Sequence, residues 1–205
     1  MVFFFIIEVN INKYSEVNMG IVTKTGDKGT TGTLGGKRLL KSSSLLELNG
    51  QIDEVNASLG YLNSLLDEAK DFPTKAEVME FIRYIQNGLY NLGTEVSSGF
   101  TIVRFDESHA LLLEEKIDEM TALMPPQTKF IIFSGKKEAT YTHVVRSISR
   151  RCERQFVRFL LEENVDPFPH SYKFLNRLSD YLFTLARFIN QELGGEEIET
   201  IPWEK

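Results

Sequence analysis

The feature that most constrains this chain is the spacing of its apolar residues, which recur every three or four positions through five long segments. Between residues 74 and 98 the spacing alternates between four and three, through Val78, Ile82, Ile85, Leu89, Leu92 and Val96. This is the period of a helix with one buried face, and the seam pattern of a helical bundle. Similar patterns predict helices at 42–69, 107–124, 137–164 and 171–193. We therefore expect an all-α fold, an up-and-down bundle of five helices.

Residues that commonly begin or end helices lie at the borders of these segments. Serines 42–44 can cap the first helix, and Pro73 precedes the second. Pro125 and Pro126 end the third helix, and glycines 194–195 end the last. The short apolar stretch KFIIFSG is expected as a connection into the fourth helix.

The composition is that of an ordinary globular protein of about one domain. The chain has 205 residues, 42% of them hydrophobic and 25% charged, which is enough to bury a sizeable core. A net charge of −6 argues against non-specific binding to nucleic acid, and no apolar run approaches the roughly 20 residues that span a bilayer. The single cysteine, Cys152, cannot form an internal disulfide. We therefore expect a cytoplasmic protein with no membrane and no nucleic-acid partner.

The first 19 residues are expected to be an N-terminal extension of unknown role, ahead of a bundle domain at 20–205. Their apolar run, VFFFII, is only six residues long, has no basic residue before it and is followed by Glu8. These features argue against a secretory signal. The run could be a strand against the bundle, or Met19 could be the functional start.

A second informative feature is the segment at 22–41, VTKTGDKGTTGTLGGKRLLK, which concentrates glycine, threonine and lysine. Glycines let backbone N–H groups approach an anion, threonines donate hydroxyls, and lysines neutralise charge. The segment is not a Walker A loop, because Arg38 follows Lys37, and it is not a GxGxxG dinucleotide loop. A polyphosphate-binding loop and a flexible surface loop both remain compatible with it.

The fourth predicted helix carries a charged face. Arg146, Arg150 and Glu153 are spaced i, i+4 and i+7, and Arg151 and Arg154 flank them. Such a face is usually a solvated, salt-bridged surface. Because arginine forks bind phosphate oxygens, this cluster in an acidic protein could also meet an anion.

Two other helices place polar residues beside their apolar seams: Asn49, Asp53 and Asn56 in the first, and Asn176, Arg177 and Asp180 in the last. Such groups need partners when buried, either as structural pairs or as the lining of one cleft. His143 is expected to be packed or hydrogen-bonded, and Cys152 to be a core residue. The sequence offers no His/Cys metal cage and no readable Ser-His-Asp arrangement.

Four blocks together carry a family resemblance: TKTGDKGTTGTLGG, GQIDEVNASLG, RSISRRCERQF and KFLNRLSDYLFTLARF. Their order and spacing resemble those of the ATP:cob(I)alamin adenosyltransferases of the propanediol-utilisation (PduO) type. The resemblance covers about residues 20–192, nearly all of the chain beyond the N-terminal extension.

This resemblance implies a homotrimer of five-helix bundles, with each active site between two subunits and with ATP and cob(I)alamin as substrates. The residues that match the family's nucleotide site are Thr23, Lys24, Thr25, Gly26, Thr31, Gly32, Lys41, Arg150, Arg151, Cys152, Glu153, Arg154 and Asn176. The residues that match catalytic positions are Arg150, Asp53, Arg146 and Glu153, with Asp53 expected to pair with Arg150 across the interface. Phe130 matches an aromatic residue at the corrinoid face.

The implied reaction is attack of Co(I) on the 5′ carbon of ATP, which gives adenosylcobalamin and triphosphate. Lysines, arginines, loop N–H groups and Mg²⁺ would stabilise the leaving triphosphate, with Mg²⁺ held mostly by phosphate oxygens and water. Phe130 would fill the space of the corrinoid's displaced lower ligand. A flavoprotein reductase and an adenosylcobalamin-dependent enzyme are the further partners implied.

The chain departs from the family pattern at two places. Gly32 stands where serine is common, so a backbone contact is expected in place of a hydroxyl. In FIIFSGKK, Phe133 replaces a proline and Lys136 a glycine, so we expect a repositioned loop at the corrinoid. Two other readings stay open: a non-catalytic ATP-binding or cobalamin-delivery bundle, and a structural helical oligomer whose arginines form interfacial salt bridges.

Overall fold

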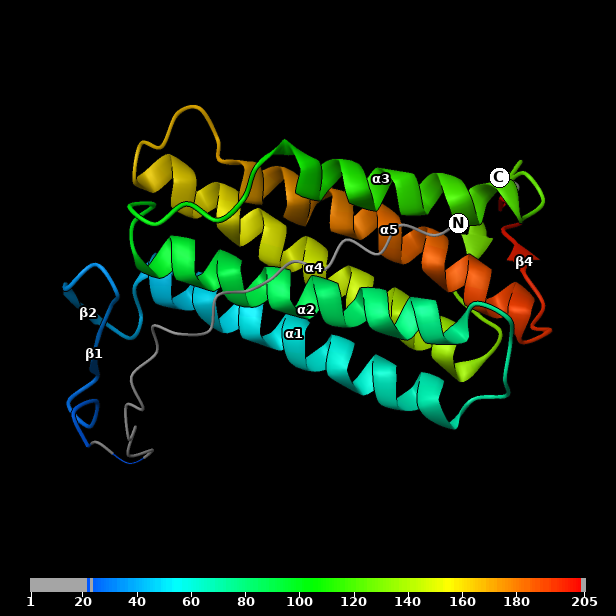
Figure 1. Ribbon diagram of the computed structural model, residues 1–205, viewed down its shortest axis with the longest axis horizontal. Coiled ribbons are helices and arrows are strands. Elements are labelled where there is room, and N and C mark those ends of the chain that lie inside the picture. The colour runs from blue at the N-terminus through cyan, green and yellow to red at the C-terminus, as the bar shows by residue number, and fades with distance from the viewer. Residues whose placement is uncertain (1–21, 23, 204–205) are drawn as a thin grey trace, which may run out of the picture.

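The computed structural model describes residues 22 and 24–203, and Figure 1 shows them as a bundle of five long helices. The helices are α1 (Ser44–Glu68), α2 (Lys75–Ser97), α3 (Glu107–Ala122), α4 (Lys137–Glu162) and α5 (His170–Glu192). Each predicted helix is confirmed, with ends within two residues of those expected. The expected N-terminal extension at 1–19, like Thr23, lies outside the described residues.

Successive helices run in opposite directions along the long axis, which confirms the up-and-down arrangement (Figure 1). Helix α1 packs against α2 on one side and α4 on the other, and α4 packs against α5. Helix α3 packs against α5 rather than against its successor, α4. The connection from α3 to α4 therefore crosses the end of α5, where it meets the C-terminal segment.

The apolar seams read from the sequence form the core. On α2 all six seam positions are buried, and on α4 the positions Val145, Cys152 and Phe156 are fully buried. Large aromatic side chains of α5, among them Phe174 and Phe188, complete the interior. The periodicity therefore identified the buried faces of α2 and α4 correctly.

Two short pairs of antiparallel strands lie at opposite ends of the bundle (Figure 1). At one end, β1 (Thr30–Gly32) pairs with β2 (Arg38–Leu40), with Thr31 opposite Leu39. At the other end, β3 (Ile131–Ile132) pairs with β4 (Ile198–Glu199). These strands were not predicted, because strands of two or three residues are too short to show alternation in the sequence.

Within the described part of the chain, no helix is both long and apolar enough to cross a bilayer.

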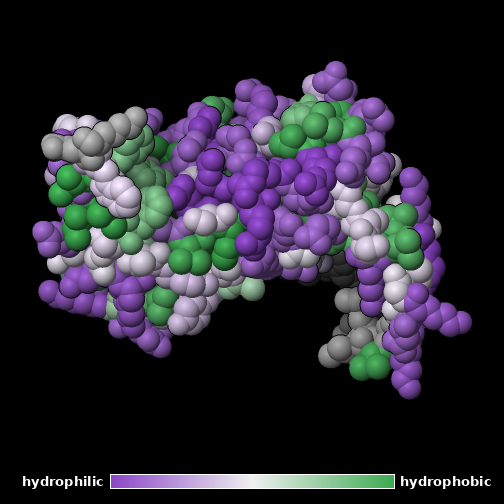
Figure 2. Space-filling model, turned by 180° about the vertical axis from the view of Figure 1, so that it is seen from behind, coloured by the Kyte–Doolittle hydropathy of each residue, from purple (hydrophilic) through white to green (hydrophobic). Residues whose placement is uncertain are grey.

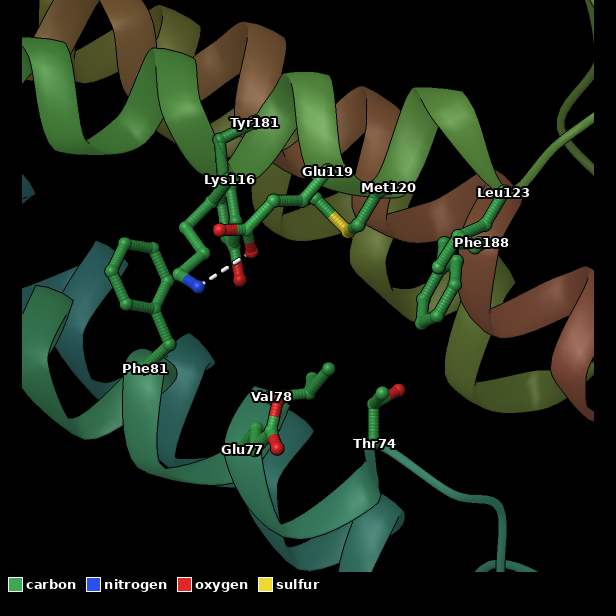
Figure 3. Close-up of a pocket in the computed structure, with 10 residues that line it drawn as sticks. All are labelled: Thr74, Glu77, Val78, Phe81, Lys116, Glu119, Met120, Leu123, Tyr181 and Phe188. Atoms are coloured by element: carbon green, nitrogen blue, oxygen red, sulfur yellow. Dashed lines mark hydrogen bonds and ion pairs between the residues drawn. The ribbon is translucent and has the colours of Figure 1, made fainter. Parts of the chain in front are cut away.

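A small groove lies between α2 and α3, over α5 (Figure 3). Its volume is about 80 Å³, and it is lined by Thr74, Glu77, Val78, Phe81, Lys116, Glu119, Met120, Leu123, Tyr181 and Phe188. Lys116 and Glu119 form an ion pair of 2.6 Å at its rim. Tyr181 points from α5 into the groove, and burial raises the pKa of its hydroxyl. The groove contains none of the residues predicted to bind a substrate.

Replacing Tyr181 with phenylalanine should change the free energy of unfolding by less than about 0.5 kcal/mol. The hydroxyl donates to none of the described residues, so the substitution removes no protein hydrogen bond. Removing a hydroxyl that does form a hydrogen bond usually lowers the free energy of unfolding by about 1 kcal/mol. Urea denaturation of both proteins measures the difference, and a loss of about 1 kcal/mol or more would show that the hydroxyl has a partner.

Candidate functional site

The β1–β2 hairpin is built on a glycine-rich turn that Lys41 closes. Gly29 has a φ of +75° and Lys24 a φ of +57°, so the backbone turns sharply there. The Lys41 N–H donates to the Gly29 carbonyl at 2.9 Å. The Lys41 side chain lies over Gly26, where a Cβ would be only 3.0 Å from Nζ. A cationic ammonium therefore lies against the half-buried backbone at Gly26, an arrangement suited to an anion.

The tip of this hairpin is held against the end of α2. Leu34 donates its N–H to Ser97 Oγ at 3.1 Å, and Gly35 donates to the Ser97 carbonyl at 3.1 Å. A Cβ on Gly35 would lie 3.3 Å from the Ser98 carbonyl oxygen, so glycine permits this close approach. Arg38 reinforces the hairpin from within by donating to Thr30 Oγ1 at 2.9 Å and to the Thr25 carbonyl. The segment is thus fastened to the bundle.

A polar groove of about 260 Å³ lies between this tip, α1 and α2. Its lining residues are Leu34, Asn49, Ile52, Asp53, Asn56, Leu89, Tyr90, Gly93, Thr94 and Ser97. Asn56 is used structurally, because it exchanges hydrogen bonds with Gln86 of α2. Asn49 Oδ1 is buried without a partner, and Asp53 is exposed and forms no ion pair among the described residues. The groove therefore offers hydrogen-bond acceptors to a ligand that carries hydroxyl or amino groups.

The charged face of α4, which we call the arginine face, comprises Arg146, Arg150, Glu153 and Arg154. Glu153 accepts a hydrogen bond of 2.8 Å from Asn176 of α5, so these two predicted residues are brought together. Arg150 and Arg154 are exposed, and neither pairs with an acid in the described part of the chain. Arg151 differs, because it pairs with Glu54 of α1, and that pairing raises its pKa.

Arg146 lies among aromatic rings, an arrangement that the sequence pattern does not predict. Its guanidinium carbon is 4.8 Å from the ring centre of Phe133 and 5.8 Å from that of Phe183. Phe133 in turn stacks on the His143 ring at 4.3 Å, with an angle of 27° between the planes. Burial and the neighbouring Arg150 lower the pKa of Arg146. Its Nε is buried and donates to no described residue.

The free energy of unfolding should fall as the pH is lowered below 6.5, because His143 is held neutral in the folded protein. Burial, followed by repulsion from Arg146, lowers the pKa of His143 to about 4, against a small opposing effect of Glu197. The folded state therefore prefers neutral His143. Above pH 6.5 the residue is neutral in the unfolded chain as well, so no stability is lost to its protonation. Between pH 6.5 and 4 the unfolded chain binds the extra proton, so the free energy of unfolding should fall by about 2 to 3 kcal/mol.

Urea denaturation at several pH values, with His143→Asn as the matched variant, isolates this effect. Carboxyl groups titrate in both proteins and cancel in the difference. The variant should lose clearly less stability than the wild type over this range. Equal pH dependence of the two proteins would contradict a buried, neutral His143.

The predicted corrinoid-face residue, Phe130, lies next to the paired strands β3 and β4, which we call the β3–β4 ribbon. Thr200 donates its N–H to the Phe130 carbonyl at 2.8 Å, and Lys129 pairs with Glu199 at 2.6 Å. The Phe130 side chain is 82% exposed. The other exposed apolar residues there are Ile132, Phe133, Ile198, Ile201 and Trp203. Figure 2 shows apolar side chains gathered at this end of the molecule, opposite the β1–β2 hairpin.

One chain does not bring all the predicted residues together. The polar groove is bounded by α1 and α2, whereas the arginine face contacts α5, on the other side of the α1–α4 pair. The β3–β4 ribbon lies at the far end from the hairpin. Cys152 is fully buried in the core, and burial raises the pKa of its thiol to about 12, so its side chain does not reach this surface. Within the hairpin, Thr31 is half-buried and Gly32 is exposed.

Comparison with known proteins adds independent findings. A family model described as cobalamin adenosyltransferase matches residues 21–189. The chain is 35% identical over 179 residues to a cobalamin adenosyltransferase of Cupriavidus metallidurans, a match that covers 87% of this chain and 92% of the relative. It is 36% identical over 183 residues to a corrinoid adenosyltransferase of Bacillus subtilis, a match that covers 88% of this chain and 92% of the relative.

A solved structure is similar over most of the fold. It is a variant of the PduO-type ATP:corrinoid adenosyltransferase from Lactobacillus reuteri, complexed with cobalamin and ATP. The TM-score is 0.79 at 32% sequence identity, and the match covers 88% of this chain and 99% of that chain.

Proposed function

We propose an activity from the premise that this chain belongs to the cobalamin adenosyltransferase family: it transfers the 5′-deoxyadenosyl group of ATP to the cobalt of a reduced corrinoid. Cob(I)alamin and ATP are the substrates, and adenosylcobalamin and triphosphate are the products. The observation that carries the proposal is the arginine face, whose exposed Arg150 and Arg154 have no acidic partner among the described residues. An acidic protein that keeps such charges unpaired is suited to a polyphosphate.

The reaction requires that the charge of the leaving triphosphate be stabilised and that the 5′ carbon be positioned in line with the cobalt. Co(I) donates an electron pair to the 5′ carbon, the cobalt–carbon bond forms, and the bond from that carbon to oxygen breaks. The electron pair leaves on triphosphate. Backbone N–H groups of the hairpin, the Lys24 and Lys41 ammonium groups and the α4 arginines would hold the phosphates and stabilise this charge. The acceptors Asn49 and Asp53 would face the donors of the nucleoside.

The separation of the parts within one chain supports a site shared between copies. Helix α4 has 26 residues and is therefore about 39 Å long. A nucleotide held at the hairpin could not also reach Phe130, which lies at the other end of the same bundle. A second copy would place its arginine face and β3–β4 ribbon against the hairpin and polar groove of the first. A homotrimer, with Asp53 of one copy facing Arg150 of the next, satisfies this requirement.

Mg²⁺ would fit such a site as a companion of the triphosphate. The described residues contain no group of three acidic, histidine or cysteine side chains able to hold a metal ion. Mg²⁺ commonly takes its ligands from phosphates and water, with one or two carboxylates. Bound in that way, it would supply further charge stabilisation, while the hairpin and the arginines fix the phosphates.

The proposal also covers the domain boundaries, the cellular compartment and the protein partners of the chain. Residues 20–205 form the adenosyltransferase domain, and residues 1–19 are an extension to which we assign no role. The cytoplasm is the proposed compartment. A flavoprotein reductase that generates Co(I) and an adenosylcobalamin-dependent enzyme that receives the product are the proposed protein partners.

An anaerobic assay tests the activity. The protein is mixed with ATP, Mg²⁺ and chemically reduced cobalamin, and the visible spectrum is followed for formation of the cobalt–carbon bond. Product at a rate well above the protein-free reaction supports the proposal. ATP binding without product would favour a non-catalytic ATP-binding or cobalamin-delivery bundle. No thermal shift with ATP would favour a structural oligomer.

A further inference from the structure

We propose that Phe133 is a positioning residue, which holds Arg146 in its working orientation and thereby couples the β3–β4 ribbon to the nucleotide side of the site. This inference rests on the proposed function. It assigns a role to the residue at which the chain departs from the family's proline, within FIIFSGKK.

The packing around Phe133 is layered. Its ring lies on the His143 ring at 4.3 Å, and the Arg146 guanidinium carbon lies 4.8 Å from its centre. The His143 side chain is only 5% exposed and its low pKa keeps it neutral, so the layer beneath Phe133 carries no competing charge. Phe183 of α5, 5.8 Å from the same guanidinium carbon, bounds the stack on another side. A cation held over aromatic rings in a half-buried place is attracted by the ring faces.

The guanidinium carbon of Arg146 lies over the Phe133 ring, and no acid among the described residues pairs with the group. The N–H donors of arginine lie in the plane of the group, where they bind carboxylate or phosphate oxygens. Arg146 Nε is buried and donates to no described residue. Leaving such a donor unpaired costs free energy, and no described acid neutralises the guanidinium, so the aromatic rings hold in place a cation that can still bind an anion.

Phe133 also belongs to the segment that carries Phe130. It follows β3 directly, and β3 is fastened to β4. Two residues further on, Gly135 packs against the side chain of Asn190, and the Lys136 N–H donates to Asn190 Oδ1 at 3.0 Å. A displacement of this segment at the corrinoid face would therefore move the ring that orients Arg146, which neighbours Arg150 on the arginine face.

A double-mutant cycle tests the coupling by ATP binding, with no corrinoid present. Phe133→Leu keeps apolar bulk and removes the aromatic face, whereas Phe133→Tyr and Phe133→Trp keep it. Phe133→Leu should weaken binding of Mg-ATP, measured by calorimetry, by roughly 3- to 10-fold, and the Tyr and Trp variants should remain within about 2-fold of wild type. In an Arg146→Gln background, the Leu substitution should have almost no further effect.

The matched control is Phe81→Leu, which changes a phenylalanine of α2 that stacks on Tyr84 and lines the groove between α2 and α3, where no predicted site residue lies. Circular dichroism and the thermal midpoint confirm that each variant is folded. Unchanged ATP affinity in Phe133→Leu, an equal loss in the Tyr and Trp variants, or independent effects of Phe133 and Arg146 would each overturn the proposal. Because binding needs no turnover, a wild type that makes no adenosylcobalamin would refute the activity but leave this cycle readable.

Discussion

Replacing Arg150 with alanine should slow adenosyl transfer by about 10² to 10³-fold, mainly in kcat. Arg150 is exposed on the arginine face, beside Arg146, and no acid in the described part of the chain neutralises it. Its charge is therefore available to a leaving group that gains negative charge as the carbon–oxygen bond breaks. Removing one preorganised donor of this kind typically costs a factor of about 10² to 10³. Anaerobic assays at several ATP concentrations separate kcat from KM.

Arg83→Ala is the matched control, because Arg83 is an exposed arginine of α2, away from the arginine face, with no acidic partner among the described residues. It should leave the rate within about 2-fold of wild type, since surface charges remote from a site contribute little. Arg150→Lys should lie between wild type and alanine, because lysine keeps the charge but not the planar fork. Similar rates for Arg150→Ala and Arg83→Ala would remove Arg150 from the proposed site.

The bundle could be predicted from the sequence because its physical cause is local. A helix that buries one face must repeat apolar residues every three or four positions, and Val78 through Val96 show this without any knowledge of neighbouring helices. The ends were marked by residues that cannot continue a helix, such as Pro125. The resemblance added roles for residues that periodicity leaves uninterpreted, including Asp53 and Asn176.

Tertiary contacts determine what the sequence could not reveal. The pairing of Ile131 with Glu199 joins residues far apart in the chain, and no local pattern encodes it. The stack of Arg146 on Phe133 depends in the same way on a connection that folds back over α4. Arg151 was grouped with the nucleotide-binding arginines, but its pairing with Glu54 depends on how α1 lies against α4. The one sequence signal for the contact between Arg146 and Phe133 was the unusual aromatic residue at position 133 in FIIFSGKK.

Replacing Gly135 with alanine should lower the free energy of unfolding by about 3 to 5 kcal/mol. Gly135 has a φ of +102°, which costs about 1 to 2 kcal/mol in residues with a Cβ. A Cβ there would also lie 2.1 Å from Asn190 Oδ1. Asn190 cannot yield freely, because it is buried, accepts from the Lys136 N–H and donates to the Glu196 carbonyl at 3.0 Å. Losing these buried hydrogen bonds adds about 2 to 3 kcal/mol.

Gly194→Ala separates backbone strain from collision. Gly194 also has a positive φ, +66°, but no atom lies within 4 Å of the place its Cβ would take. It should therefore lose only about 1 kcal/mol, the cost of the backbone conformation alone. Urea denaturation of both variants gives the comparison. Equal losses would mean that Gly135 is needed for its backbone angles and that the contact with Asn190 contributes nothing.

A second substitution at the contact sharpens the test. If collision with Asn190 dominates the loss in Gly135→Ala, then Asn190→Ala opens the space that the new methyl group needs. The double variant should then be more stable than the sum of the two single losses predicts, by about 1 to 3 kcal/mol. Because Asn190 links the start of α4 to the segment after α5, the same experiment measures how firmly the bundle holds the β3–β4 ribbon and, through it, Phe130. Strictly additive losses would show that the ribbon does not depend on this contact for its position.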